Sequence, residues 1–295
     1  MQVSKMKNLV TTFVLFLVFI QSADCIEVID DIGRTIKIDS PARRIVSLAP
    51  HITENIFAAG AGHLIIGVVS YSDFPLPAKS IPVIGAYNNF NIEAIVASQP
   101  DLIIAWKEGN QRQQVEKLIA LGINVYINDS TTLEDIAQNI RHFGVLAGTN
   151  DKAQKASNIF LARLQSLRMQ YSNLKKVRVF YQTWNTPLIT VNNAQSIGQI
   201  IQLCSGDNIF GELTARSPQV NIEAVLASNP DTIIASGMNK SRPDWLDEWK
   251  KWSFLKSVDK DYLFFVPPDL IQRYSPRILD GAEMICEYLQ QVRDA

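Results

Sequence analysis

The sequence predicts an α/β protein built from two similar α/β lobes that one long rigid helix joins. Three observations support this fold class: one 16-residue segment occurs twice, short apolar runs alternate with helical segments in each half, and an uninterrupted helical pattern separates the halves. Because strands that alternate with helices form parallel sheets, we expect a mostly parallel sheet in each lobe.

The repeated segment reads NIEAIVASQPDLIIAW at residues 91–106 and NIEAVLASNPDTIIAS at residues 221–236, with 11 identities in 16 ungapped positions. The copies are 130 residues apart, far more than the ~20–50 residues of a solenoid repeat and close to one domain length. Each lobe therefore has one glutamate, Glu93 or Glu223, at an equivalent point. Proteins with two lobes most often bind ligands between them, so we expect a ligand cleft there.

The N-terminal lobe is predicted to span residues 26–148. Its expected strands are 44–48, 65–70, 101–105 and 123–127, and its expected helices are 53–60, 91–98, 111–121 and 133–146. Proline or glycine stands at the end of several of these elements and interrupts regular structure. Asn91 is the expected N-cap of the repeat helix, where the Glu93 carboxylate suits the helix dipole.

Residues 149–174 are the predicted connecting helix. From residue 151 to 174 apolar residues recur near the 3.6-residue period of an α-helix, with no glycine or proline. A helical connector is stiff, unlike a Gly/Ser linker. The C-terminal lobe, residues 175–295, then has expected strands at 177–182 and 262–266, expected helices at 196–204, 245–252 and 276–292, and the second copy of the repeat.

Residues 1–25 are typical of a cleaved secretory signal peptide. Lys5 and Lys7 precede an apolar run from Leu9 to Ile20, and small or polar residues follow as far as Cys25. The run is shorter than the ~20 residues that a membrane span needs. An N-terminal anchor is the alternative, and so is a lipid anchor on Cys25, although the aspartate before it argues against lipidation.

The composition is that of an ordinary exported globular protein. The net charge is −1, 47% of residues are hydrophobic, and no basic stretch resembles a nucleic-acid footprint. Without the signal peptide two cysteines remain, Cys204 and Cys286. An even number in an exported protein favours a disulfide, and two buried free thiols are the alternative.

No pattern in the sequence assembles catalytic or metal-binding chemistry. The three histidines, His51, His63 and His142, are far apart, and no phosphate loop or nucleophile motif is present. These absences together favour a binding protein over an enzyme. His51 follows the first strand and is either a residue that lines the cleft or a surface or helix-start histidine.

Aromatic residues gather in loops at the ends of strands. Tyr71, Tyr87 and Trp184 have Asn, Asp, Pro and Gly as neighbours, where α/β sheets bind ligands. Flat aromatic surfaces suit a large, flat, partly apolar ligand, and the alternative is a satellite core. Asp269 and Arg273 are candidates for polar ligand contacts or, alternatively, for an exposed ion pair.

Glu93 and Glu223 form a symmetric pair of negative side chains on the two lobes. Such a pair suits two basic sockets on a dimeric partner, because arginine–carboxylate contacts fix register. The alternative for each is a solvated carboxylate at a helix start.

Several segments together resemble a known family. They are SLAPHITE at 47–54, SYSDFP at 70–75, the first repeat, QLCSGDNIF at 202–210 and SPRILDGAEMIC at 275–286. From about residue 28 to 290 the chain resembles the cobalamin branch of the periplasmic substrate-binding proteins that serve ABC importers. The broader family takes ferric siderophores, haem and cobalamin on two α/β lobes joined by a rigid helix.

The resemblance implies roles for particular residues. Glu93 and Glu223 correspond to glutamates that dock on arginines of the membrane permease, and Cys204 and Cys286 match a disulfide pair. The implied ligand-lining residues are Tyr71, Tyr87, Trp184, Asp269 and Arg273. Ser217 and Leu270 depart from the family pattern, since they stand where the cobalamin branch has pocket tryptophans.

The sequence therefore predicts a periplasmic protein, monomeric, that binds cobalamin or a related corrinoid and delivers it to an ABC importer permease dimer in the inner membrane. We expect no catalytic residues, no cofactor, no resident metal and no nucleic-acid partner. One alternative is a haem- or ferric-siderophore-binding protein of the same fold. An exported enzyme is the alternative from another class.

Overall fold

The computed structural model describes residues 25–237 and 241–295. The predicted signal peptide lies outside the described residues except for Cys25, which is free and exposed. The strands are β1 Ile26–Ile29, β2 Thr35–Ile38, β3 Ile45–Ser47, β4 Ile65–Val68, β5 Gly85–Ala86, β6 Asn89–Phe90, β7 Leu102–Trp106, β8 Val125–Asn128, β9 Val177–Gln182, β10 Gly206–Asn208, β11 Thr232–Ala235 and β12 Leu263–Phe265.

The α-helices are α1 Pro50–Ala58, α2 Ile92–Ala97, α3 Arg112–Ala120, α4 Leu133–Ala147, α5 Asn150–Tyr171, α6 Ser196–Leu203, α7 Ile222–Ser228, α8 Lys256–Asp259, α9 Pro268–Ile271 and α10 Ile278–Arg293. The 3-10 helices are η1 Gly62–Leu64, η2 Leu76–Ser80 and η3 Asp244–Lys251. The segment predicted as a helix at 245–252 is thus a 3-10 helix.

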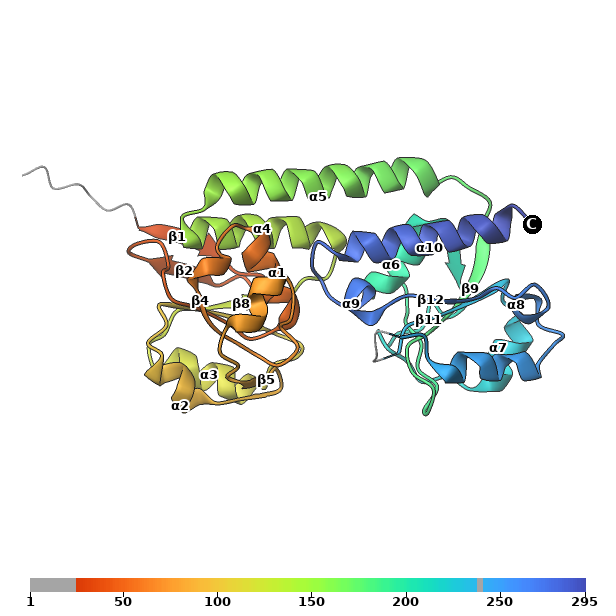
Figure 1. Cartoon of the computed structure of the whole chain (residues 1–295), viewed down its shortest axis with the longest axis horizontal. Helices are drawn as coiled ribbons and strands as arrows, with labels where there is room; N and C mark the ends of the chain where they lie inside the picture. The colour runs from red at the N-terminus through yellow and green to blue at the C-terminus, as the bar shows by residue number, and fades with distance from the viewer. Residues whose placement is uncertain (1–24, 238–240) are drawn as a thin grey trace, which may run out of the picture.

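Two four-stranded parallel sheets form the centres of the lobes. The strand order is β4-β3-β7-β8 before α5 and β10-β9-β11-β12 after it. In each lobe the first strand of the sheet therefore lies between the second and the third, so the two lobes have the same topology. The expectation of an α/β fold with two similar lobes is confirmed (Figure 1).

Both faces of each sheet are buried, as in other parallel sheets. Along β7, Leu102 and Ile104 face one hydrophobic cluster, while Ile103 faces another that includes α2 and α3 residues. Along β11, Ile234 faces the first cluster and Ile233 faces a third, within the second lobe. The first cluster is shared by the two lobes.

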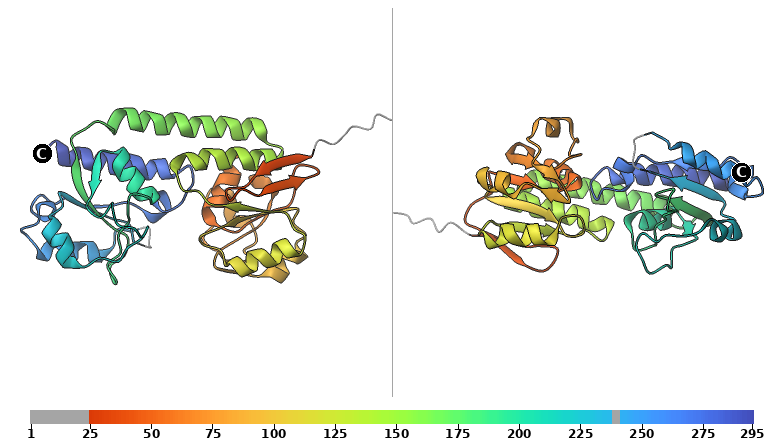
Figure 2. Two further views of the ribbon diagram at one scale, coloured as in Figure 1. Left: turned by 180° about the vertical axis from the view of Figure 1, so that it is seen from behind. Right: turned by 90° about the horizontal axis from the view of Figure 1, so that it is seen from below.

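Helix α5 connects the lobes and contributes to that shared cluster. Its residues Phe160 and Leu164 are buried in the cluster with residues of both sheets. Figure 1 shows α5 along one side of the molecule, with α4 and α10 beneath it, and Figure 2 shows the same arrangement from behind. Arg163 of α5 also pairs with Asp280 and Glu283 of α10, at 2.7 and 2.6 Å. The connector is therefore packed along its length against both lobes.

The disulfide between Cys204 and Cys286 is present and buried. It joins the C-terminal end of α6 to the middle of α10. The prediction of a bridge over two free thiols is confirmed.

The two repeat copies fold alike, beginning with their caps. The side chain of Asn91 accepts a hydrogen bond from the amide of Ala94 at 2.9 Å, and Asn221 accepts one from Ala224 at 2.8 Å. The predicted N-cap at Asn91 is confirmed. An asparagine therefore satisfies free amide groups at the start of each short helix.

The symmetry extends to the other end of each repeat helix. The Arg44 guanidinium donates to the carbonyl of Ser98, at 2.6 Å from Nη2, and Arg178 donates to the carbonyl of Ser228. Positive charge at a helix C-terminus is favourable, because the last carbonyl groups have no partner within the helix. Each repeat helix is thus held at both ends.

Candidate functional site

Polar contacts between the lobes join segments that follow the carboxyl ends of strands. Glu108 after β7 pairs with Arg216 after β10, at 3.0 Å, and Gln199 of α6 donates to the carbonyl of Thr131 after β8, at 2.7 Å. The carboxyl ends of the two sheets therefore face one another. Parallel α/β sheets bind ligands at this edge, which is where the sequence predicted the site.

An aromatic cluster of Trp106, Tyr87 and His51 lies at this edge of the first lobe. The centroid of the Trp106 ring lies 5.7 Å from that of the Tyr87 ring. It lies 5.1 Å from the centroid of the His51 ring, which it meets edge to face. The Asn110 amide nitrogen donates to the Tyr87 carbonyl at 2.6 Å, and its oxygen accepts from the Trp106 amide at 2.6 Å. Asn110 therefore fixes the backbone that carries both rings, which are only partly buried.

Tyr71 follows β4 and has an unusual backbone conformation. Its φ is 67°, in the left-handed region that costs an L-residue about 1–2 kcal/mol. Its side chain is 75% exposed, so internal packing does not compensate for this strain. The neighbouring Ser70 amide donates to the Gly85 carbonyl at 2.8 Å and holds this loop beside the one that carries Tyr87. Strain of this kind often occurs at ligand-binding sites.

Trp184 is the aromatic residue of the second lobe that sequence analysis selected. It follows β9 in a turn closed by Ile189, and its indole nitrogen donates to the Thr186 carbonyl at 3.0 Å. With Trp245 and other residues of this lobe it lines a cavity of about 380 Å³. Part of the Trp184 ring remains exposed, so the residue can still offer a surface to a ligand.

His51 is in the first turn of α1 and is buried. Its Nε2 lies 3.1 Å from the Asn128 side-chain oxygen. Burial lowers the pKa of His51 to about 4, partly opposed by the Asn128 hydrogen bond. The histidine is therefore neutral near pH 7. His51 is therefore at a helix start, as one interpretation expected, but it is not at the surface, and the interpretation that it lines the cleft stays a prediction.

An ion cluster at the lobe interface contains Glu54, Asp73, Asp269, Arg273 and Arg277. Glu54, on α1, is 3% exposed. It accepts hydrogen bonds from Arg273 at 3.0 Å, from Ser275 at 2.7 Å, and from Arg277 at 2.9 and 2.5 Å. All three donors belong to the segment between α9 and α10. This lobe-interface ion cluster therefore fixes the second lobe against the first.

Asp269 and Arg273 belong to this cluster. They pair with each other at 2.8 Å, and Arg273 also contacts Asp73 at 3.4 Å. Both side chains are mostly buried, so the pair is not the exposed ion pair that was the alternative. A ligand role for either residue remains a prediction.

Glu93 and Glu223 are exposed, each in the first turn of its repeat helix. Their helices, α2 and α7, lie on the side of the molecule opposite α5 (Figure 1). Each lobe therefore has one exposed glutamate on a repeat helix of that side.

Ser217 is exposed beside Arg216, and Leu270 lies on α9 next to Asp269. Both positions that depart from the family pattern are therefore next to residues of the lobe interface.

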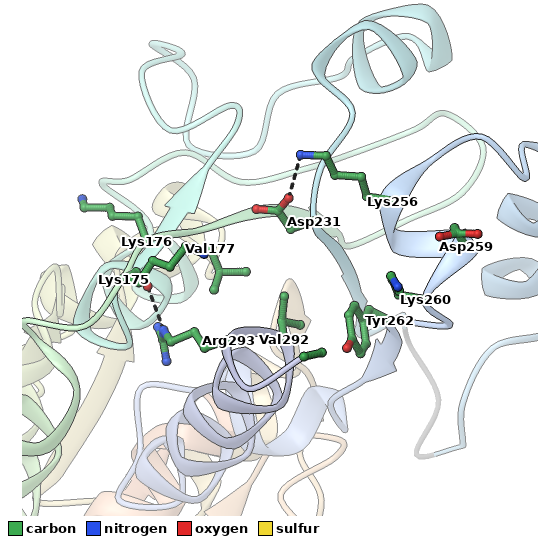
Figure 3. Close-up of a pocket in the computed structure, with 11 residues that line it drawn as sticks. Lys175, Lys176, Val177, Asp231, Lys256, Asp259, Lys260, Tyr262, Val292 and Arg293 are labelled. Carbon is green, nitrogen blue, oxygen red and sulfur yellow. Dashed lines mark hydrogen bonds and ion pairs between the residues drawn. The ribbon is translucent and has the colours of Figure 1, made fainter.

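A separate basic cavity of about 230 Å³ lies at the amino ends of β9, β11 and β12 (Figure 3). Lysines such as Lys175 and Lys256 line it together with Arg293, and Lys256 pairs with Asp231 at 3.3 Å. None of the predicted ligand-contact residues lines it. It is therefore distinct from the aromatic surfaces.

Within residues 25–237 and 241–295, no group of three or more His, Cys, Asp or Glu side chains is arranged to hold a metal ion. In the same ranges no helix combines the length and apolar character that a membrane span requires.

The topology and the aromatic surfaces are those of a two-lobed binding protein. A family model described as a periplasmic binding protein matches residues 45–270. The chain therefore belongs to the periplasmic binding protein family, whose members are binding proteins of the periplasm and not enzymes.

Individual relatives indicate the branch of this family to which the chain is similar. The vitamin B12-binding protein of Vibrio cholerae is 38% identical over 251 residues, which cover 85% of this chain and 90% of that protein. That of Salmonella paratyphi A is 36% identical, with 85% and 91% covered. The resemblance to the cobalamin branch is thus confirmed.

Comparison with solved structures supports the same branch. The periplasmic vitamin B12 binding protein BtuF of Vibrio cholerae matches with a TM-score of 0.79 at 36% identity, covering 86% of this chain and 99% of that one. The periplasmic haem binding protein HutB of the same organism shares the fold, with a TM-score of 0.73 at 19% identity over 83% and 98% of the two chains.

Trp106, Asn110 and Glu54 are among the residues of this region that sequence analysis missed. Trp106 is the last residue of the first repeat copy, where the second copy has Ser236. This difference between two otherwise similar copies was the signal that could have marked Trp106 as a functional residue. Asn110 and Glu54 gave no such signal, because each resembles an ordinary polar residue at a helix or loop.

Proposed function

We propose that this protein binds cobalamin or a related corrinoid between its lobes and delivers it to the permease of an ABC importer. The observation that carries this proposal is the set of partly exposed aromatic rings at the facing carboxyl edges of the two sheets. This set is Tyr71, Tyr87 and Trp106 on the first lobe and Trp184 on the second. Its members suit a large, flat ligand with apolar faces. The vitamin B12-binding relatives support the same ligand class.

A haem- or siderophore-binding role is the second candidate, because a haem binding protein has the same fold. Haem would require an axial ligand. The His51 ring is buried against Trp106 and Asn128, so it does not offer one to the space between the lobes. Tyr71, at 75% exposed, is the best placed axial candidate. The partly exposed aromatic surfaces and the vitamin B12-binding relatives favour the corrinoid.

Docking on the permease is proposed for Glu93 and Glu223. Supporting observations are their exposure, their equivalent first-turn positions and the placement of α2 and α7 on one side of the molecule. Export by cleavage of the signal peptide at residues 1–25 and a monomeric state belong to the same proposal.

The test is a tryptophan-fluorescence titration of the purified protein with cyanocobalamin, dicyanocobinamide, haem and a ferric hydroxamate in parallel. We expect saturable 1:1 quenching by cyanocobalamin, because Trp106 and Trp184 lie on the proposed contact surfaces. Binding of haem or the hydroxamate, with no response to either corrinoid, would refute the proposal. A Soret shift in the haem arm would identify axial ligation.

A further inference from the structure

The ion pair between Glu108 and Arg216 lies beside the proposed ligand surfaces. Glu108 is two residues after Trp106, and Arg216 directly precedes Ser217, one of the two positions that depart from the family pattern. The two side chains meet at 3.0 Å across the lobes. The pair is also close enough to the half-buried Tyr274 for both charges to influence its pKa, which burial raises.

Arg216 differs from the other arginines that join the lobes in the described part of the chain. Arg273 is 14% exposed and Arg277 is 17% exposed, and Glu54 binds both. Arg216 is 36% exposed, and its partner Glu108 is 50% exposed. Ion pairs exposed to this degree contribute only ~0–1 kcal/mol, so Arg216 can exchange its partner easily.

We propose that Arg216 is a specificity-determining residue that binds the phosphodiester of a nucleotide-bearing corrinoid, with Glu108 as the carboxylate that the phosphodiester displaces. This inference rests on the proposed function. A guanidinium group binds phosphate oxygens with two parallel hydrogen bonds, which suits the anionic nucleotide loop of cobalamin. Cobinamide lacks that loop and gains nothing from Arg216.

The experiment measures the affinities of Arg216→Ala and Glu108→Gln for cyanocobalamin and dicyanocobinamide by calorimetry. For Arg216→Ala we expect roughly tenfold weaker binding of cyanocobalamin, the scale of one charge-assisted hydrogen bond, and less than about twofold change for dicyanocobinamide. Glu108→Gln should strengthen cyanocobalamin binding by about two- to fivefold, because the competing carboxylate is gone. Wild-type affinity for cyanocobalamin should fall with added salt, and that for dicyanocobinamide should not.

Arg168→Ala is the matched control, since Arg168 forms a similarly exposed pair with Glu134 between α4 and α5, away from the proposed site. It should leave both affinities unchanged. Equal weakening of both corrinoids by Arg216→Ala and Glu108→Gln would overturn the proposal and make the pair a bridge between the lobes only. A wild-type protein that binds neither corrinoid would instead refute the proposed function.

Discussion

Replacing Glu54 by glutamine should destabilise the protein by about 3–5 kcal/mol, the range for breaking a buried ion pair. The substitution keeps the size of the side chain, so no cavity forms. It removes the negative charge that Arg273 and Arg277 face, and it places an N–H donor where the carboxylate accepted four hydrogen bonds. Arg273 keeps Asp269 as a partner at 2.8 Å, so the loss falls mainly on Arg277 and Ser275.

Urea unfolding followed by circular dichroism measures the change in the free energy of unfolding. Glu134→Gln is the control, because Glu134 pairs with Arg168 on the exposed side of α4 and α5, and such pairs contribute ~0–1 kcal/mol. If Glu54→Gln lowers the free energy of unfolding by no more than Glu134→Gln does, the lobe-interface ion cluster does not stabilise the lobe arrangement as argued.

Four further predictions concern the ligand, the disulfide, the connector and docking. Trp184→Ala should weaken cyanocobalamin binding by about 1–3 kcal/mol, as loss of an aromatic contact does; calorimetry that shows unchanged affinity would remove Trp184 from the site. Removing the Cys204–Cys286 bridge, which spans 82 residues, should cost about 2–5 kcal/mol in chemical unfolding, and a cost below this range would mean that the bridge adds little. Small-angle scattering should give nearly the same radius of gyration with and without cyanocobalamin, because α5 and the shared core resist bending; a decrease of several ångströms would contradict this. Charge reversal of both Glu93 and Glu223 to lysine should abolish uptake in cells while leaving ligand affinity nearly unchanged, because two contacts become repulsive, and sustained uptake would end the docking hypothesis.

Local signals predicted much of the fold. The expected strand at 177–182 coincides with β9, and the expected helix at 133–146 differs from α4 by one residue. Helix α4 has a capping box at Thr132 and a glycine, Gly148, at its C-terminal end, and β9 is a short, mostly apolar run between loop segments. The β1–β2 hairpin was not predicted, because two four-residue strands give too short a pattern. The lobe boundaries at residues 148 and 174 stay predictions.

The site was predicted only in part, because several of its contacts are non-local. Glu54 and Arg277 are 223 positions apart in the chain, and no periodicity links them. Glu54 resembles an exposed residue of a short helix until the second lobe covers it. Tyr71, Tyr87 and Trp184 could be selected because loop aromatics at strand ends are hard to explain as core. Their ligand role stays a prediction.

The two copies of the repeat agree at one end and differ at the other. A chain with two lobes of the same topology, each with an asparagine cap and an arginine at the far end of its repeat helix, is what duplication of one ancestral half would leave. Glu93 and Glu223 have stayed identical, as selection by a two-fold symmetric partner would require. Trp106 and Ser236, at the other end, have diverged, as selection by a ligand without two-fold symmetry permits.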